Sequence, residues 1–165
     1  MHPRFHAEST PDKPALIMAG SGETVTLGEL EQRANRGAHA LRQLGLKNGD
    51  ALAIACDNRL EFFDIYWAAQ RSGLILVLLS ARLKTDEIAY IVNDSGAKAV
   101  LISDAMAGTA RDVAGNRQAM PGITEIVTIG AVDALPDWLK LCERQPATPI
   151  ADEEIGGRMV YSSGT

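Results

Sequence analysis

The sequence is poor in cysteine and aromatic residues, and it has no cluster of basic residues. Its two cysteines, Cys56 and Cys142, lie far apart and form no CxxC pair, which excludes a disulfide framework and a cysteine-based metal site. Lysine and arginine occur singly or in isolated pairs, and the net charge is -5. Nucleic-acid binding is therefore not expected.

Long apolar segments are also missing. The longest, residues 74–79, has six residues, whereas a membrane-spanning helix needs about 20. The first six residues contain no apolar stretch of a signal peptide. Among them, His2 and His6 could share one helical face, but no third ligand accompanies them, so no metal site is expected. We expect a cytoplasmic protein without a transmembrane segment.

The composition that remains is that of an ordinary globular protein. Hydrophobic residues make up 46% of the 165 residues and charged residues 22%. A domain has about 150 residues on average. The length therefore predicts one domain, with a substantial core.

Apolar runs typical of strands alternate with helical patterns along nearly the whole chain. Strands are predicted at residues 15–18, 51–56, 74–79, 99–102, 123–129 and 158–161, and helices at 27–44, 58–72, 85–95, 105–119 and 135–142. Thr26 and Glu29 form the sequence of a capping box, and Gly45 follows the last apolar position of that helix. Asn58 and Thr85 are predicted to cap the next two helices.

The run at residues 51–56 consists of six apolar residues without alternation. Such a strand is covered on both faces, which requires helices above and below the sheet. The predicted fold class is therefore α/β, with a mostly parallel sheet and helices on both faces. The aromatic residues Phe62, Phe63, Tyr66 and Trp67 fall at helical spacing and are predicted to pack in the core.

The sequence ends with an apolar strand that leads directly into Ser162, Ser163, Gly164 and Thr165. A loop that wraps a polyphosphate needs glycine, so that backbone N–H groups can approach the anion, and hydroxyl groups that donate further hydrogen bonds. No lysine follows, and no complete GxxxxGK[ST] motif is present. By itself, this segment is also compatible with a strand followed by a polar terminus.

Five groups of residues occur in an order that is typical of one family. They are His2-Pro3 with residues 10–16 (TPDKPAL), residues 25–30 (VTLGEL), residues 44–46 with Gly49-Asp50, Arg82-Leu83 through residues 87–98 (EIAYIVNDSGAK), and residues 161–165 (YSSGT). Over essentially the whole chain, they resemble the N-terminal part of the adenylate-forming acyl-CoA synthetases, also called the AMP-dependent synthetase/ligase family. The fatty-acyl-CoA ligase branch is the most similar.

This resemblance implies an ATP-dependent acyl-CoA ligase. Full-length members activate a carboxylic acid with ATP and Mg²⁺, release pyrophosphate from the acyl-adenylate step, and transfer the acyl group to CoA. The resemblance implies that Ser162, Ser163, Gly164 and Thr165 approach the β and γ phosphates. The acid would be a fatty acid. Three positions depart from the residues that are usual in the family. Leu27 replaces the usual Tyr, Leu78 the usual Pro and Ser80 the usual Asn. These are changes in packing.

We expect residues 1–165 to be the N-terminal part of the AMP-binding domain, an incomplete subdomain truncated inside the ATP-phosphate loop. Catalytic residues, the lysine of the loop and the acid-binding pocket would lie outside it, so the chain alone should be inactive and should bind neither ATP, Mg²⁺ nor CoA tightly. In the longer protein, strands from later parts of the chain would cover an edge of the sheet. Without them, that edge stays unpaired, and we expect it to promote self-association.

The alternative is a stand-alone flavodoxin-like or Rossmann-like module that binds nucleotides or a partner. Such a module should carry a phosphate fingerprint after its first strand, yet residues 18–24 (MAGSGET) do not complete GxGxxG. Cys56, at the end of a predicted strand, is interpreted as a small buried hydrophobic residue rather than a reactive thiol, because no histidine lies near it in the sequence.

Overall fold

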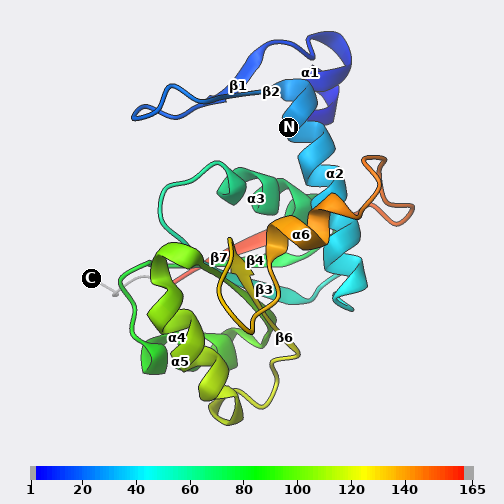
Figure 1. The fold of residues 1–165 in the computed structure, drawn as a ribbon. Coiled ribbons are helices and arrows are strands. Elements are labelled where there is room, and N and C mark those ends of the chain that lie inside the picture. The colour runs from blue at the N-terminus through cyan, green and yellow to red at the C-terminus, as the bar shows by residue number, and fades with distance from the viewer. Residues whose placement is uncertain (1–2, 162–165) are drawn as a thin grey trace.

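A five-stranded parallel sheet lies at the centre of the protein (Figure 1). The computed structural model describes residues 3–161 of the chain. The strand order is β6-β5-β3-β4-β7, and every neighbouring pair is parallel. The strands are β3 (Ala51–Ala55), β4 (Ile75–Leu79), β5 (Ala97–Ser103), β6 (Glu125–Ile129) and β7 (Gly157–Val160). The predicted parallel α/β sheet is confirmed.

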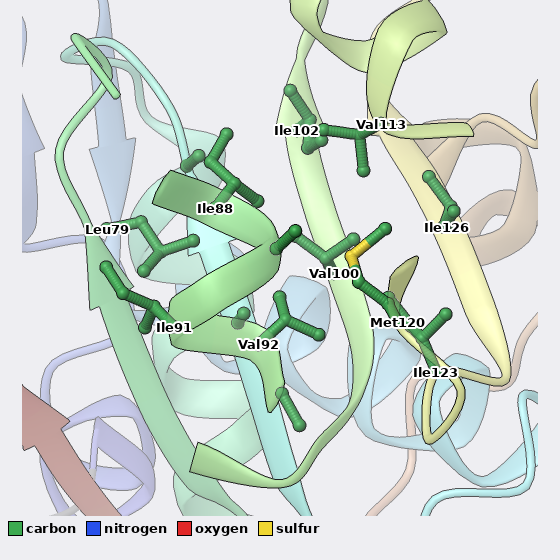
Figure 2. Packing of buried hydrophobic residues seen from close by; sticks show 14 of the residues in the cluster. Leu79, Ile88, Ile91, Val92, Val100, Ile102, Val113, Met120, Ile123 and Ile126 are labelled. Carbon is green, nitrogen blue, oxygen red and sulfur yellow. The ribbon is translucent and has the colours of Figure 1, made fainter. Parts of the chain in front are cut away.

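Helices cover both faces of this sheet, as the unbroken apolar run of β3 predicts. One face packs against α2 (Leu27–Gln43), α3 (Glu61–Arg71) and α6 (Trp138–Glu143), and the other against α4 (Thr85–Ser95) and α5 (Ala107–Gly115). Leu52 and Ile54 of β3 belong to the first layer, and Ala51, Ala53 and Ala55 to the second. Figure 2 shows the second layer, in which α4 lies over the strands. All five residues of β3 are buried.

The N-terminal elements do not join the sheet. After α1 (Pro3–Ser9), β1 (Pro14–Ile17) and β2 (Thr24–Thr26) form a separate antiparallel hairpin. The prediction that residues 15–18 belong to the parallel sheet is therefore wrong. Pro14 has no N–H to donate to a sheet ladder, and the hairpin instead packs through Val25 against Leu30 of α2 and Leu60. Figure 1 shows it beside the start of α2, away from the sheet.

The predicted ends of α2 are confirmed. The Thr26 hydroxyl accepts a hydrogen bond from the Glu29 backbone N–H at 3.2 Å, and the Glu29 carboxylate accepts one from the Thr26 N–H at 2.8 Å. Gly45, which follows the helix, has a φ of 84°, in the left-handed region that glycine tolerates. Local sequence signals thus account for both ends of this helix.

Three other helix boundaries differ from the predictions. Helix α3 begins after Leu60 without a side-chain cap, so Asn58 does not cap it. Thr85 is the first residue of α4 rather than its cap, and the Lys84 backbone N–H donates to the Glu87 carboxylate at 2.8 Å instead. The helix predicted at 105–119 is divided into η1 (Asp104–Met106), α5 and η2 (Arg117–Ala119), because α5 ends at Gly115, a poor helix former.

Candidate functional site

The strand order reverses at the carboxyl edge of the sheet, between β3 and β5. From β3 the chain crosses to β4 on one side and then returns to β5 on the other. In open α/β sheets, ligands bind at the carboxyl edge beside such a reversal, because the loops diverge there. The loops that leave this edge therefore form the candidate site.

A cluster centred on Arg59 joins the loops that follow β3, β5 and β6. The Arg59 guanidinium donates to Asp57 Oδ1 through Nε at 2.9 Å and to Asp104 Oδ1 through Nη2 at 2.8 Å. Its Nη1 donates to the Ile129 carbonyl at 2.7 Å. The hydroxyl of buried Ser103 donates to Asp57 Oδ1 at 2.6 Å. Three of the five N–H donors of Arg59 are bonded inside the cluster, so Arg59 ties the three loop regions together.

The electrostatics of the cluster agree with that structural role. Burial alone would raise the pKa of Asp57, but the hydrogen bond from Ser103 and the charge of Arg59 hold it below its ordinary value. Gly130, which follows β6, has a φ of 99°, and a Cβ there would collide with the Asp104 carboxylate. The cluster thus requires glycine at this position.

Sequence reasoning did not single out this cluster. A signal was nevertheless present, because Asp57 and Asp104 each come almost directly after a buried parallel strand. Carboxyl ends of parallel strands meet at one edge of a sheet, so the two carboxylates could have been placed together. The position of Arg59 between them could have suggested the ion pairs.

Three adjoining cavities surround the end of β4, and Leu78 lines all of them. Their volumes are about 610, 390 and 570 Å³. The first extends between α1, β1 and α3, the second reaches Asp57 and Asn58 after β3, and the third lies against α4. The carboxyl edge is therefore hollowed on the β4 side of the reversal and tied by ion pairs on the β5 side.

Tyr161 stands at the entrance to the predicted phosphate segment. Val160 pairs with Leu78 in the parallel ladder of β7 and β4, so Tyr161 leaves the sheet at its carboxyl edge and lines the 570 Å³ cavity. Its hydroxyl donates to Asp94 Oδ2 at 2.6 Å, and this bond to a carboxylate raises the pKa of Tyr161 to about 12. The predicted site residues Ser162, Ser163, Gly164 and Thr165 lie outside the described residues.

Helix α3 buries Ile65, Ala68 and Ala69 fully in the sheet core, and its aromatic residues lie at the margin of that core. Phe62 and Tyr66 are partly buried and pack against it, as predicted. Trp67 packs against the hairpin cluster, and Phe63 is 39% exposed, so the prediction of core packing is wrong for Phe63. All four aromatic residues line the 610 Å³ cavity toward α1 and the hairpin. Their rings contact one another in a row along the helix. The cavity therefore has an aromatic wall.

The other candidate groups are the Cys56 thiol and possible metal ligands. Burial raises the pKa of the Cys56 thiol to about 11, so it remains protonated near neutral pH, as the sequence interpretation predicts. Within residues 3–161, no three histidine, cysteine, aspartate or glutamate side chains converge to hold a metal ion. In the same part of the chain, no helix has the length and apolar character needed to cross a membrane.

Comparison with known proteins places this arrangement in a family. A family model described as AMP-binding enzyme matches residues 4–165. The chain belongs to this family. The predicted resemblance is therefore confirmed, and the chain corresponds to a portion of the adenylate-forming acyl- and aryl-CoA ligases within the AMP-binding enzymes.

Two curated relatives and one solved structure illustrate the similarity. The long-chain-fatty-acid–CoA ligase FadD13 of Mycobacterium tuberculosis (strain CDC 1551 / Oshkosh) is 30% identical, over 98% of this chain and 32% of that protein. The 3-hydroxybenzoate–CoA ligase of Aromatoleum sp. (strain CIB) is 31% identical, over 96% and 30%. The inhibitor-bound N-terminal domain of FACL13 from Mycobacterium tuberculosis superposes with a TM-score of 0.86 at 25% identity, over 99% of this chain and 40% of that one.

The chain spans less than a third of the length of these two curated relatives. The superposition covers nearly all of the chain, so the hairpin and the sheet belong to one fold shared with that N-terminal domain. The chain is thus a portion of the ligase fold.

Proposed function

We propose that this chain acts as part of an ATP-dependent acyl-CoA ligase, in which residues 1–165 form the N-terminal part of the AMP-binding domain. The observation that carries the proposal is the course of β7. This strand runs parallel to β4 and brings Tyr161 to the hollowed carboxyl edge, immediately before Ser162 in the sequence. A segment of serine, glycine and threonine at that edge is suited to a polyphosphate.

In this proposal, Ser162, Ser163, Gly164 and Thr165 contact the β and γ phosphates of ATP. Their backbone N–H groups and hydroxyls supply donors, while cations must offset the phosphate charge. The 570 Å³ cavity beside Tyr161 is lined by Asp86 and Glu87, and none of its described lining residues is a lysine or arginine. In this proposal, the cations that offset the phosphate charge come from residues other than those that line this cavity.

We infer that the 165-residue chain has no ligase activity by itself. The chemistry of ATP, Mg²⁺ and CoA belongs to the longer enzyme in this proposal. The described residues supply no cluster of metal ligands, so no Mg²⁺-dependent step is assigned to them. Their part is to carry the phosphate segment on β7, the edge strand of the parallel sheet.

The proposed acid substrate is a fatty acid. FadD13 is named as a long-chain-fatty-acid ligase, which supports this choice, whereas the Aromatoleum relative is named for 3-hydroxybenzoate. The two relatives therefore suggest two acids to compare as substrates. A long alkyl chain and a hydroxylated ring need pockets of different shape and polarity, so the enzyme should distinguish them.

The test compares the 165-residue chain with the protein encoded by the reading frame continued beyond Thr165. Each is assayed for acyl-CoA formation from ATP, CoA and either dodecanoate or 3-hydroxybenzoate. The continued protein should form dodecanoyl-CoA and the short chain none. In the continued protein, Ser163→Ala should lower the rate by roughly 10²-fold, as for the loss of one donor to a reacting anion, while Ser21→Ala in the hairpin should not. Thioester formation by the short chain alone would contradict the proposal.

A flavodoxin-like nucleotide module is the second candidate, because strands β4-β3-β5-β6 follow the order 2-1-3-4 of that fold. The Arg59 cluster ties the edge at the reversal, which speaks against a ligand there. Titration calorimetry of the 165-residue chain with FMN and with ATP separates the candidates. Tight binding of either would favour the module.

A further inference from the structure

A cavity of about 450 Å³ lies between α2, α3 and α6, away from the carboxyl-edge site. Its lining residues are Arg33, Arg36, Glu61, Asp64, Trp138, Leu139, Cys142 and Glu143. Trp138 is almost completely buried, while Leu139 is 39% exposed although it is a large apolar side chain. The cavity thus combines an apolar wall from α6 with charged groups from all three helices.

Asp64 of α3 is the unusual member of this lining, because its carboxylate is buried without adequate partners. The residue is 7% exposed. Its Oδ2 lies 3.8 Å from Nη1 of Arg33, which is too far for a hydrogen bond. Its Oδ1 is sealed from solvent and receives no hydrogen bond within residues 3–161. A buried carboxylate with only one distant cation is costly to ionise, so a cation that reaches Asp64 from the cavity it lines is favoured.

The groups around Asp64 make the cavity acidic. Helix α2 contributes Arg33 and Arg36, and the Arg36 guanidinium already donates to the Gln145 carbonyl at 2.5 Å. Carboxylates come from Glu61 on α3 and Glu143 on α6. With Asp64 ionised, three carboxylates and two arginines give the lining a net formal charge of -1.

Protonation of Asp64 adds a pH dependence to this charge. Burial raises its pKa to about 7, against the smaller opposing effect of the Arg33 charge, while Glu61 raises it further. The carboxylate is therefore ionised above about pH 7 and neutral below. The Cys142 thiol faces the same cavity, and its burial raises its pKa as well, so it adds no charge near neutral pH.

We propose that this cavity binds a small organic cation, a primary ammonium on a short apolar body. The ammonium donates hydrogen bonds to the Asp64 carboxylate, and the apolar body lies against Trp138 and Leu139. An anionic ligand would meet three carboxylates against two arginines and is disfavoured by the net negative charge. This site is independent of the proposed ligase function.

Benzylammonium chloride is the probe, and benzyl alcohol is its neutral match. The indole N–H of Trp138 and the amides of α3 and α6 are followed by ¹⁵N–¹H NMR of the 165-residue chain at pH 8. Benzylammonium should give saturable shifts, roughly tenfold tighter than benzyl alcohol. Binding should weaken as the pH falls through about 7, because Asp64 then takes up a proton.

Two variants and one control complete the experiment. Asp64→Asn keeps the shape of the side chain without its charge and should weaken benzylammonium binding by roughly tenfold. Leu139→Lys places a competing cation on the cavity wall and should weaken it similarly, which provides a second test if Asp64→Asn fails to fold. Asp133→Asn, at an exposed aspartate outside the lining, should leave affinity unchanged. Absence of saturable shifts, or equal affinity of the Asp64→Asn variant, would overturn the proposal.

Discussion

The Tyr161 hydroxyl donates a 2.6 Å hydrogen bond to the Asp94 carboxylate, which joins the residue after β7 to the end of α4. These two residues are 67 positions apart in the sequence. Their bond fixes the place from which the chain continues toward Ser162. The exit of the last described strand is thus anchored by a specific contact as well as by the ladder with β4.

This hydrogen bond predicts that Tyr161 loses its proton at a higher pH than an ordinary tyrosine. The pKa of Tyr161 is raised from 10.0 to about 12, mainly by the hydrogen bond to Asp94. The folded state therefore retains a proton that the unfolded state loses, so this stabilisation is complete below about pH 10 and is lost as the pH rises toward 12. Absorbance at 295 nm should show a tyrosine step near pH 12. Asp94→Asn should move it to lower pH, while Asp86→Asn, on the same helix, should not.

Gly130 should be intolerant of a side chain. Its φ of 99° is strained for alanine, and the added Cβ would displace the Asp104 carboxylate from Arg59. Gly130→Ala should lower the free energy of unfolding by about 3 kcal/mol, from strain and a broken ion pair. Gly22→Ala serves as the control, since Gly22 also has a positive φ but has open space around it, and its cost should be near 1 kcal/mol. Urea denaturation measures both, and equal losses would argue against the clash.

Arg71 is a buried cation that connects α3 to α2 and to the segment before β7. Its side chain is 1% exposed and lies 2.6 Å from Glu31 and 3.4 Å from Glu153. Arg71→Met should lower the free energy of unfolding by about 3–5 kcal/mol, because Glu31 loses its 2.6 Å partner in a buried environment and Glu153 is left with its ion pair to Arg4. Exposed Arg111→Met should change it by less than about 0.5 kcal/mol. A loss below about 1 kcal/mol for Arg71→Met in thermal or urea unfolding would contradict this.

The outer edge of β7 should promote self-association. The Pro136–Asp137 segment bonds to Thr128 and covers part of the β6 edge, whereas β7 pairs only with β4 among the described strands. Val160 on β7 is 63% exposed. Such an edge can pair with a second copy of the chain.

Sedimentation velocity tests this association. The chain should form dimers or larger species at micromolar concentration, and Val160→Lys should shift it toward monomer by placing a charge on the edge. Ile17→Lys, at a similarly exposed position on the hairpin, should have a smaller effect. A wild-type chain that stays monomeric over the whole concentration range would refute the prediction.

The sequence alone determined the alternation of strands and helices, the ends of α2 and the parallel character of the sheet. These features depend on residues near one another along the chain: the Thr26 and Glu29 caps, and the unbroken apolar run of β3 that demands cover on both faces. The motifs also pointed to the AMP-binding family, which the family match confirms. The predicted phosphate contacts of residues 162–165 stay a prediction.

Tertiary structure decided the separate hairpin, the cavity along the aromatic residues of α3, the Arg59 cluster and the buried carboxylate of Asp64. Each depends on which distant segments meet, and that choice is made by packing of the whole chain rather than by local periodicity. Helix α3 illustrates the reason, because the small residues Ala68 and Ala69 pack fully against the sheet layer while Phe62 and Tyr66 are only partly buried against it. The same orientation places the aromatic rings along a cavity and Asp64 beside a second cavity between three helices.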